Sequence, residues 1–165
     1  SGSTRPVSAG DKIFSYIKNL AIKKGMVVDC IDIRRLSVTE HVENKLDHPS
    51  MNLSELTEHM KAADAVLLVT PELNSGLSRN QQNILMRAKK YCQGKPVGLV
   101  GYGWSFAKQV HMHAYQTLKN VGAYIIPSSV RLSFMKDIST HGDILDTKHV
   151  GRMINSLLDD LRVVA

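Results

Sequence analysis

The stretch that decides the fold is Ala65-Val66-Leu67-Leu68-Val69-Thr70-Pro71-Glu72-Leu73-Asn74-Ser75-Gly76. Its first five residues form a short apolar run rich in strand formers. The rest combines a proline, a glycine and polar turn formers, and segment 80–92 follows with helical spacing. In an open α/β sheet, ligands bind at loops beyond the carboxyl ends of strands. We therefore expect this loop to aim backbone N–H and C=O groups at a flat ligand.

Helix-like and strand-like segments alternate along the rest of the chain. Apolar residues at helical spacing between Ile13 and Ala21 precede a strand-like segment at 26–33. The pattern continues with a short helix after residue 52, strand 65–69, helix 80–92, strand 97–100, helix 105–121, strand 123–126 and a final helix around residues 150–161. Helices that separate short apolar strands predict a parallel, doubly wound sheet with helices on both faces.

No internal repeat or long linker divides the sequence, so residues 1–165 are predicted to form a single domain. Segment 128–146 is the longest stretch predicted to be irregular, and such loops are often lids or subunit contacts. The alternation begins with a helix, and residues 1–8 resemble the loop that should follow a first strand. We expect that strand to lie upstream of Ser1 in the natural protein, because it would be central in the sheet.

Composition excludes several classes of protein. With 43% hydrophobic and 22% charged residues, the chain is typical of a globular protein. Its net charge of +6 comes from scattered Lys and Arg, and only 5% of residues are aromatic, which disfavours a nucleic-acid binder. The sequence has no apolar run long enough to span a membrane and no secretion signal, so a cytoplasmic location is expected.

The histidines and cysteines show no spacing that favours a metal site. His111 and His113 are two residues apart, which places them on different sides of a helix. Cys30 and Cys92 match no zinc pattern and are interpreted as reduced thiols. The sequence offers no convincing nucleophile or general acid either. We expect neither a metal nor a catalytic side chain.

A second candidate binding loop lies at the start of the chain, in Gly2-Ser3-Thr4-Arg5-Pro6-Val7-Ser8. Hydroxyl donors and a forked cation stand before a helix whose N-terminus Ser8 can cap, and such an end favours an anion. The spacing matches neither a Walker loop nor the three-glycine dinucleotide motif. Together these groups could hold a phosphate. Alternatively, Ser-Gly-Ser is an expression scar and Ser8 a plain helix cap.

The opening loop resembles the Gly-Ser-x-Arg-x-x-Ser phosphate loop of the NADPH-dependent FMN reductase family. Thr70-Pro71-Glu72-Leu73-Asn74 resembles the Thr-Pro-Glu-Tyr-Asn segment that lines the flavin ring in that family. The resemblance implies a flavodoxin-like three-layer sandwich and an FMN-dependent NAD(P)H oxidoreductase. NADPH or NADH would be the co-substrate, and the acceptor would be free flavin, a quinone or an azo compound. It also implies a homodimer or homotetramer, with contacts from helix 80–92 and segment 128–146.

The resemblance assigns residues to three parts of the cofactor site. The FMN phosphate would be held by Ser3, Thr4, Arg5 and Ser8. The edge of the isoalloxazine ring would lie along Pro71, Glu72, Leu73, Asn74 and Gly76. The other side of the cleft would be closed by Tyr102, Gly103 and Trp104. In this assignment Glu72 fixes a loop and does not transfer a proton.

Several positions depart from the family pattern. Leu73 replaces an aromatic residue, and a bulky turn over residues 102–106 replaces the usual glycine-rich one. Trp104 or Tyr102 could supply the missing stacking surface, or these rings could fill the cleft and exclude flavin. Two other functions therefore stay open here: a flavodoxin-like electron carrier without nicotinamide activity, and a scaffold protein that has lost the cofactor.

Overall fold

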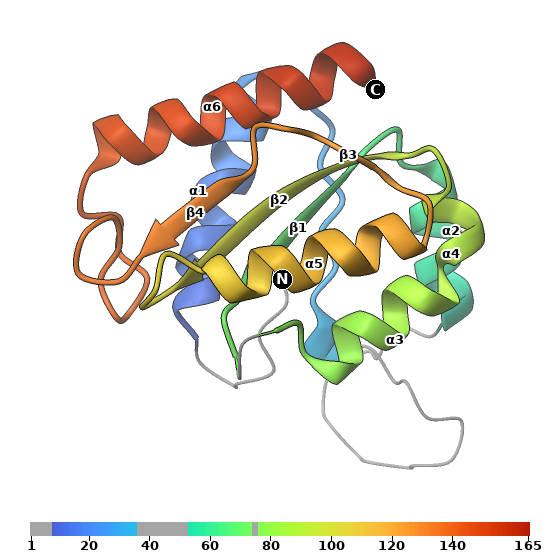
Figure 1. Ribbon diagram of the computed structural model, residues 1–165. Coiled ribbons are helices and arrows are strands. Elements are labelled where there is room, and N and C mark those ends of the chain that lie inside the picture. The colour runs from blue at the N-terminus through green and yellow to red at the C-terminus, as the bar shows by residue number, and fades with distance from the viewer. Residues whose placement is uncertain (1–7, 36–52, 74–75) are drawn as a thin grey trace.

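The computed structural model describes residues 8–35, 53–73 and 76–165. Within these ranges, four strands and six α-helices alternate along the chain, with one 3-10 turn at Ile33–Arg35 (Figure 1). The helices are α1 (Ala9–Lys23), α2 (Leu53–Ala62), α3 (Arg79–Arg87), α4 (Lys89–Cys92), α5 (Lys108–Asn120) and α6 (Thr147–Val164). The strands are β1 (Val66–Pro71), β2 (Pro96–Gly103), β3 (Tyr124–Ile125) and β4 (Val130–Ser133).

The sheet is parallel, as predicted, and is organised around β2. Strand β1 pairs along one side of β2 from Val66 opposite Val97 to Pro71 opposite Tyr102. Strands β3 and β4 share the other side: β3 pairs with the start of β2 and β4 with its end. Because every strand runs in the same direction, β1, β2 and β4 present their carboxyl ends at the same edge.

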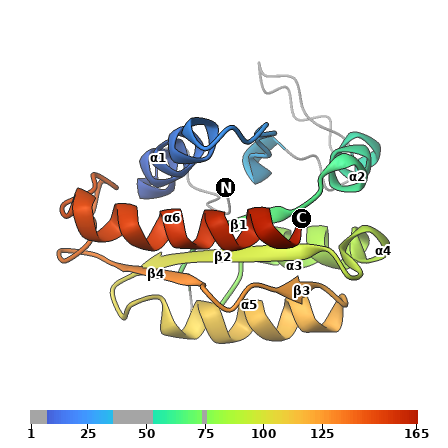
Figure 2. The same cartoon turned by 90° about the horizontal axis from the view of Figure 1, so that it is seen from above.

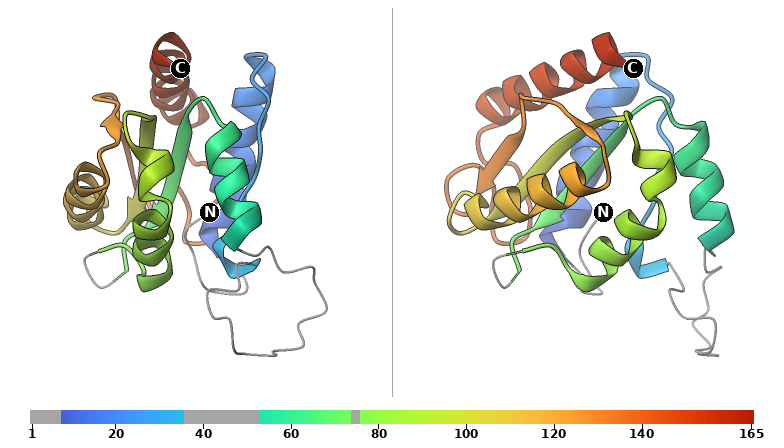
Figure 3. Two further views of the ribbon diagram at one scale, coloured as in Figure 1. Left: turned by 90° about the vertical axis from the view of Figure 1, so that its right-hand side faces the viewer. Right: turned by 45° about the vertical axis from the view of Figure 1, so that its right-hand side comes forward.

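The helices cover both faces of this sheet, which gives three layers. Figure 2 shows α6 and α5 on opposite sides of β2, and the left view of Figure 3 shows the strands between α5 and α1. Side chains of α1 and α6 pack on one face of the sheet around Val100 and Leu132. Side chains of α2, α3 and α5 pack on the other around Val97 and Leu99. The doubly wound arrangement predicted from the alternation of elements is confirmed.

Helix α6 illustrates how the sequence sets these elements. Its buried side chains recur at helical spacing and form one apolar face: Val150, Ile154, Leu157, Leu158 and Leu161. The carboxylate of Asp146 accepts a hydrogen bond of 2.8 Å from the N–H of His149, which caps the first turn. Periodicity and a cap thus place this helix where the sequence predicted it.

The prediction of a strand at residues 26–33 is wrong. Met26 and Val28 pack toward one core while Ile31 and Ile33 pack toward the other, so the side chains do alternate. However, a strand also requires a hydrogen-bonded ladder with a neighbour. Within residues 8–35, 53–73 and 76–165, every ladder between named strands involves β2, and residues 26–32 belong to none.

Two further elements differ from the prediction. Helix 80–92 is divided into α3 and α4 at Ala88. Segment 128–146, predicted to be irregular, contains β4, while the predicted strand 123–126 keeps only the two residues of β3. The two short strands are thus separate halves of one edge, interrupted by residues 126–129.

His111 fills this interruption from α5. Its Nε2 atom lies 2.9 Å from the carbonyl oxygen of Val130 and 3.1 Å from the backbone N of Gly101. A Cβ atom at Gly101 would lie 2.5 Å from the His111 ring, so the ring requires glycine at that point of β2. Burial lowers the pKa of His111 to about 4, so the imidazole is neutral at pH 7.

Candidate functional site

The loop after β1 is fixed to β2 and to α5. The N–H of Glu72 donates to the carbonyl oxygen of Tyr102 at 2.8 Å, which extends the β1–β2 pairing past the end of the strand. The Glu72 side chain turns to α5, where Oε2 accepts from the N–H of Gln109 at 3.1 Å. Its Cβ lies 2.8 Å from the place that a Cβ of Gly103 would take. Glu72 therefore links this loop to the first turn of α5, and Gly103 makes room for it.

The same loop is held where it returns at Gly76 and Leu77. Leu73 and Gly76 form an isolated antiparallel bridge, and the N–H of Gly76 donates to the Leu73 carbonyl at 3.0 Å. The next N–H, from Leu77, donates to Nδ1 of His113 at 3.0 Å. A Cβ atom at Gly76 would lie 2.3 Å from that nitrogen, so only glycine fits. His113 thus holds Gly76 and Leu77 in place, a role that its spacing from His111 did not reveal.

Ser8 caps α1 through its backbone and leaves its hydroxyl free of the usual capping bond. The N–H of Asp11 donates to the Ser8 carbonyl oxygen, and the N–H of Ser8 donates to Oδ2 of Asp11, both at 3.1 Å. The Oγ atom of Ser8 is buried and makes no hydrogen bond in the described part of the chain. A buried hydroxyl at the positive end of a 15-residue helix is suited to an anion.

The acidic group nearest this helix end is paired. Nη2 of Arg34 lies 2.6 Å from Oδ1 of Asp11 and 2.5 Å from Oδ2 of Asp32. Burial disfavours the charge on Asp32, but hydrogen bonds from Arg34 outweigh it and lower the pKa of that carboxyl. Asp11 is therefore compensated by a guanidinium, which reduces its repulsion of an anion at the start of α1.

Tyr102 joins the two predicted halves of the site. Its carbonyl receives the Glu72 N–H, while its ring, only 3% exposed, extends beneath α1. A Cβ atom at Gly10 would lie 2.4 Å from the Tyr102 hydroxyl and 3.2 Å from Oγ of Ser8. The Tyr102 side chain therefore reaches the start of α1, near Ser8.

Trp104 has the opposite environment. Its side chain is 66% exposed and contacts Phe134, with 5.3 Å between ring centroids and 59° between ring planes. Phe134 also meets the edge of Tyr102 at 6.2 Å. The loops after β2 and β4 are joined beneath these rings, because the N–H of Phe134 donates to the Gly103 carbonyl at 3.0 Å.

The structure thus brings Ser8, Glu72, Tyr102 and Gly103 to one end of the sheet, with Pro71, Leu73, Gly76 and Trp104 in the same loops. Ser3, Thr4, Arg5 and Asn74 lie outside the described residues. Gly10, His113 and Gln109 contribute contacts that the sequence did not single out. Gly10 had a usable signal, since a glycine in the first turn of a helix is unfavourable without a reason.

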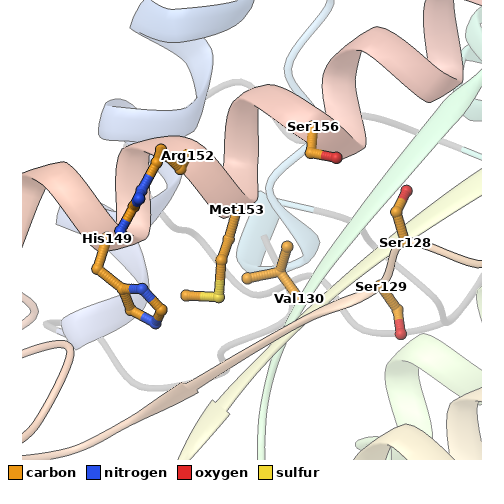
Figure 4. A pocket seen from close by; sticks show the side chains of 7 residues that line it. All are labelled: Ser128, Ser129, Val130, His149, Arg152, Met153 and Ser156. Carbon is orange, nitrogen blue, oxygen red and sulfur yellow. The ribbon is translucent and has the colours of Figure 1, made fainter.

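Two cavities lie elsewhere. One, of about 440 Å³, lies between α6 and the start of β4 and is lined by Ser128, Ser129, Val130, His149, Arg152, Met153 and Ser156 (Figure 4). A second, of about 1020 Å³, follows α5 and β3 and includes His111, Met112, Tyr115 and Arg131. Among the residues that the structure describes, none of those predicted to bind FMN lines either cavity.

Neither a membrane span nor a metal centre is found among the residues that the structure describes. Each helix there is too short or too polar to cross a bilayer. The side chains described also include no cluster of three His, Cys, Asp or Glu residues arranged to bind a metal ion.

Comparisons with known proteins now add to this geometry. No curated protein sequence matches the chain. Among solved structures, it is similar to FerB, a flavoenzyme NAD(P)H:(acceptor) oxidoreductase from Paracoccus denitrificans, with a TM-score of 0.74 and 19% sequence identity. That match covers 98% of this chain and 94% of FerB. An oxidoreductase from Corynebacterium diphtheriae matches with a TM-score of 0.65 and 17% identity, over 93% of this chain and 85% of that protein.

These structural similarities confirm the predicted flavodoxin-like fold. The family model for NADPH-dependent FMN reductases matches residues 1–137, which is most of the 165-residue chain. That range contains the opening loop, the loop after β1 and the loop after β2. The chain therefore belongs to the NADPH-dependent FMN reductase family and is an oxidoreductase that uses FMN as cofactor and NAD(P)H as electron donor.

Proposed function

We propose that this oxidoreductase passes two electrons from NAD(P)H to a small acceptor: free flavin, a quinone or an azo compound. FMN, when bound, supplies the redox chemistry by taking hydride from NAD(P)H and returning the electrons to the acceptor. For a quinone, NAD(P)H, one proton and the quinone yield NAD(P)⁺ and the hydroquinone. The protein has to bind and orient these molecules, so we assign no catalytic acid, base or nucleophile to it.

In this proposal the FMN phosphate lies at the start of α1, held by Ser3, Thr4, Arg5 and Ser8. The environment of Ser8 supports the assignment. Its buried hydroxyl has no partner in the described part of the chain, and it lies at the positive end of α1. Arg34 compensates Asp11. The buried hydroxyl and the helix end favour a dianion at this position, and the ion pair reduces its repulsion by Asp11.

The flavin ring is assigned to the loops after β1 and β2. Pro71, Glu72, Leu73, Asn74 and Gly76 would lie along one edge of the ring, with Gly103 and Trp104 on the other side and Tyr102 beneath. Glu72 and Gly76 hold the first loop against α5. A loop that is fixed in this way can present backbone groups to a planar ring without reorganising when the ring binds.

The observation that carries the proposal is the double contact of Tyr102. Its carbonyl oxygen binds the Glu72 N–H, and its hydroxyl lies beside Gly10 and Ser8. The phosphate end and the ring end of the proposed site are therefore connected by a single residue. This favours one ligand that extends across both ends, as a flavin mononucleotide would.

Titration with FMN tests the phosphate end. Replacing Arg5 with alanine should weaken FMN binding by roughly tenfold to a hundredfold, the loss of one charge-assisted contact. Arg87→Ala is the matched control, because Arg87 is exposed at the end of α3, away from these loops. Equal FMN affinity of the Arg5→Ala variant and the wild type would refute the assignment of the phosphate site.

Reduction by NADPH under exclusion of air tests the reaction. The flavin absorbance of the loaded protein should bleach on addition of NADPH and return when a quinone is added. A loaded protein that stays yellow with NADPH would instead be a flavin-binding electron carrier, and the proposed reaction would be wrong.

We also propose a cytoplasmic homodimer or homotetramer, with α3, α4 and segment 128–146 in the contact. The exposure of Met86 on α3 (54%) supports an apolar contact. Sedimentation analysis of the wild type and a Met86→Lys variant tests the assembly. A monomeric wild type would refute it, and cell fractionation checks the location.

A further inference from the structure

Exposed apolar side chains gather beyond the carboxyl ends of β2 and β4. We name this surface the aromatic rim and define it as Trp104, Phe106, Phe134, Met135 and Lys136. Trp104 is 66% exposed, Phe106 45% and Met135 68%. Single exposed apolar residues are common, but three in two adjoining loops form a patch that indicates a binding surface.

The backbone of the rim is strained. Among the described residues, the non-glycine positions with positive φ are Phe106 at 53°, Ala107 at 49° and Met135 at 65°, all in these two loops. Left-handed backbone is unfavourable for side chains larger than glycine, and such strain concentrates at ligand sites. The folded protein keeps Phe106 and Met135 at the surface despite this strain.

The rim is also held firmly, so its exposure does not come from a loose loop. The N–H of Ser133 donates to Oδ2 of the buried Asp137 at 2.8 Å, and the N–H of Met135 donates to the Ile138 carbonyl at 2.7 Å. The Ser133 hydroxyl donates to the Trp104 carbonyl at 3.4 Å, which ties the two loops together. A surface fixed in this way loses little entropy when it binds a ligand.

The charge on the rim is positive. The ammonium of Lys136 lies 5.1 Å from the centre of the Phe106 ring, on its face. The neighbouring carboxylate, Asp137, is only 3% exposed and accepts the Ser133 N–H. A molecule that approaches the rim therefore meets flat apolar surface beside an exposed cation.

We propose that the aromatic rim binds the electron acceptor and favours planar aromatic quinones that carry an anionic group such as sulfonate. The inference deepens the proposed function and rests on it. The quinone plane would lie against Trp104, Phe106 and Met135, and its anionic group would pair with Lys136. Reduction consumes NAD(P)H and one proton and yields NAD(P)⁺ and the hydroquinone, as above.

The size of the rim argues for a small molecule over a second copy of the chain. A stable protein interface usually takes about 20–30 residues from each partner, whereas the rim has five. The subunit contact proposed above for segment 128–146 would use residues of that segment outside 134–136. Two aromatic rings and a thioether are comparable in extent to a fused-ring quinone. The charge and the extent of the rim therefore both favour a planar, anionic quinone as its ligand.

The test uses the FMN-loaded protein with two probes, an anthraquinone monosulfonate and the matched hydroxymethyl anthraquinone. Trp104 is the single tryptophan of the chain, so the further quenching of its emission, beyond that caused by bound FMN, measures binding of each probe. The reaction is measured separately without air, as FMN reduction by NADPH and as the KM for each quinone.

The wild type should bind the sulfonate roughly tenfold more tightly than the neutral probe. Lys136→Gln should remove that difference and leave the KM of the neutral quinone unchanged. Phe106→Leu should raise the KM of both quinones roughly tenfold, while FMN reduction by NADPH keeps its rate. Two controls should match the wild type: Lys148→Gln, exposed on α6, and Tyr124→Leu, a 52% exposed aromatic residue at the opposite end of the sheet.

Equal affinity of the wild type for the two probes would overturn the proposal, as would unchanged KM values in Lys136→Gln and Phe106→Leu. A change in sedimentation without a change in KM would assign the rim to an interface between chains and would overturn it equally. Failure of NADPH to reduce the bound FMN would refute the proposed reaction, while the emission titration would still decide whether the rim binds anionic quinones. Circular dichroism of each variant identifies any loss of fold.

Discussion

Tyr102 and Trp104 are two residues apart at the end of the same strand, yet they have opposite environments. Tyr102 is 3% exposed and lies beneath α1, whereas Trp104 is 66% exposed and rests on the outside of Phe134. Both contact Phe134, so one ring on β4's loop separates an inner aromatic residue from an outer one. We therefore expect the inner ring to stabilise the fold and the outer ring to be available to a ligand.

The largest effect should come from truncating each ring to alanine. Tyr102→Ala removes a buried aromatic side chain and should lower the free energy of unfolding by about 3–5 kcal/mol. Trp104→Ala removes an exposed one and should lower it by less than about 1 kcal/mol. Urea unfolding of both variants measures the difference. Similar losses in the two variants would show that the rings are not divided into inner and outer roles.

The next prediction concerns the inner ring, Tyr102, and its neighbour Gly10. Gly10→Ala places a Cβ atom 2.4 Å from the Tyr102 hydroxyl. Overpacking of this kind should cost about 2–3 kcal/mol of unfolding free energy. Adding Tyr102→Phe removes that hydroxyl and should restore part of the loss, which a double-mutant cycle by urea unfolding quantifies. Strictly additive losses would mean that the Tyr102 hydroxyl does not lie beside Gly10.

A smaller effect is expected from removing the hydrogen bond between Asp137 and Ser133, which fixes the loop beside Trp104. Asp137→Ala leaves the buried N–H of Ser133 without its acceptor and should cost about 1–2 kcal/mol. Because Ser133 also ties the β4 loop to Trp104, the emission of Trp104 should shift as well. Asp137→Asn is the matched control, since its side-chain oxygen can still accept from Ser133. If the Asn and Ala variants behave alike, this bond does not hold the loop.

The most gradual effect accumulates with pH and concerns the other face of β2, where His111 contacts Gly101 next to Tyr102. The pKa of His111 is about 4 in the folded chain and about 6.5 in an unfolded chain. Between these values only the unfolded chain takes up the proton, so stability is lost as the pH falls from about 6.5 to about 4. The slope is at most about 1.4 kcal/mol per pH unit.

Urea unfolding at several pH values measures this slope. His111→Gln should flatten it between pH 4 and 6.5, whereas His141→Gln, at an exposed position, should retain it. A His111→Gln variant with the slope of the wild type would show that the imidazole does not stay neutral in the folded chain.

The fold was largely predictable because periodicity and caps are local signals. The apolar face of α6 and the strand pairs of β1 and β2 lie where their patterns place them. Strand pairing is a contact between distant residues, and this explains the failure at 26–33, where the side chains alternate without a ladder. The division of β3 from β4 had a local signal in Pro127, which cannot donate to a ladder, whereas the contact of the His111 ring with the Val130 carbonyl depends on the packing of α5.

The candidate site was predictable in its loops and less so in its side chains. The proline-bearing loop after β1 and the cap at Ser8 were identified from residue types alone. The direction of the Tyr102 ring could not be, because it depends on the space that Gly10 leaves beneath α1. The spacing of His113 from His111 argues against a metal site. Its contact with the Leu77 N–H could not be predicted, because it depends on how α5 packs.

The double contact of Tyr102 has a consequence for ligand choice. Because one tyrosine spans from the Glu72 N–H to the first turn of α1, the separation of the two ends is set by the length of that side chain. In the proposed site, the length of the chain between phosphate and ring would therefore decide which flavin fits. We expect flavin analogues with a shortened or lengthened polyol chain to bind more weakly than FMN even though both of their ends are unchanged.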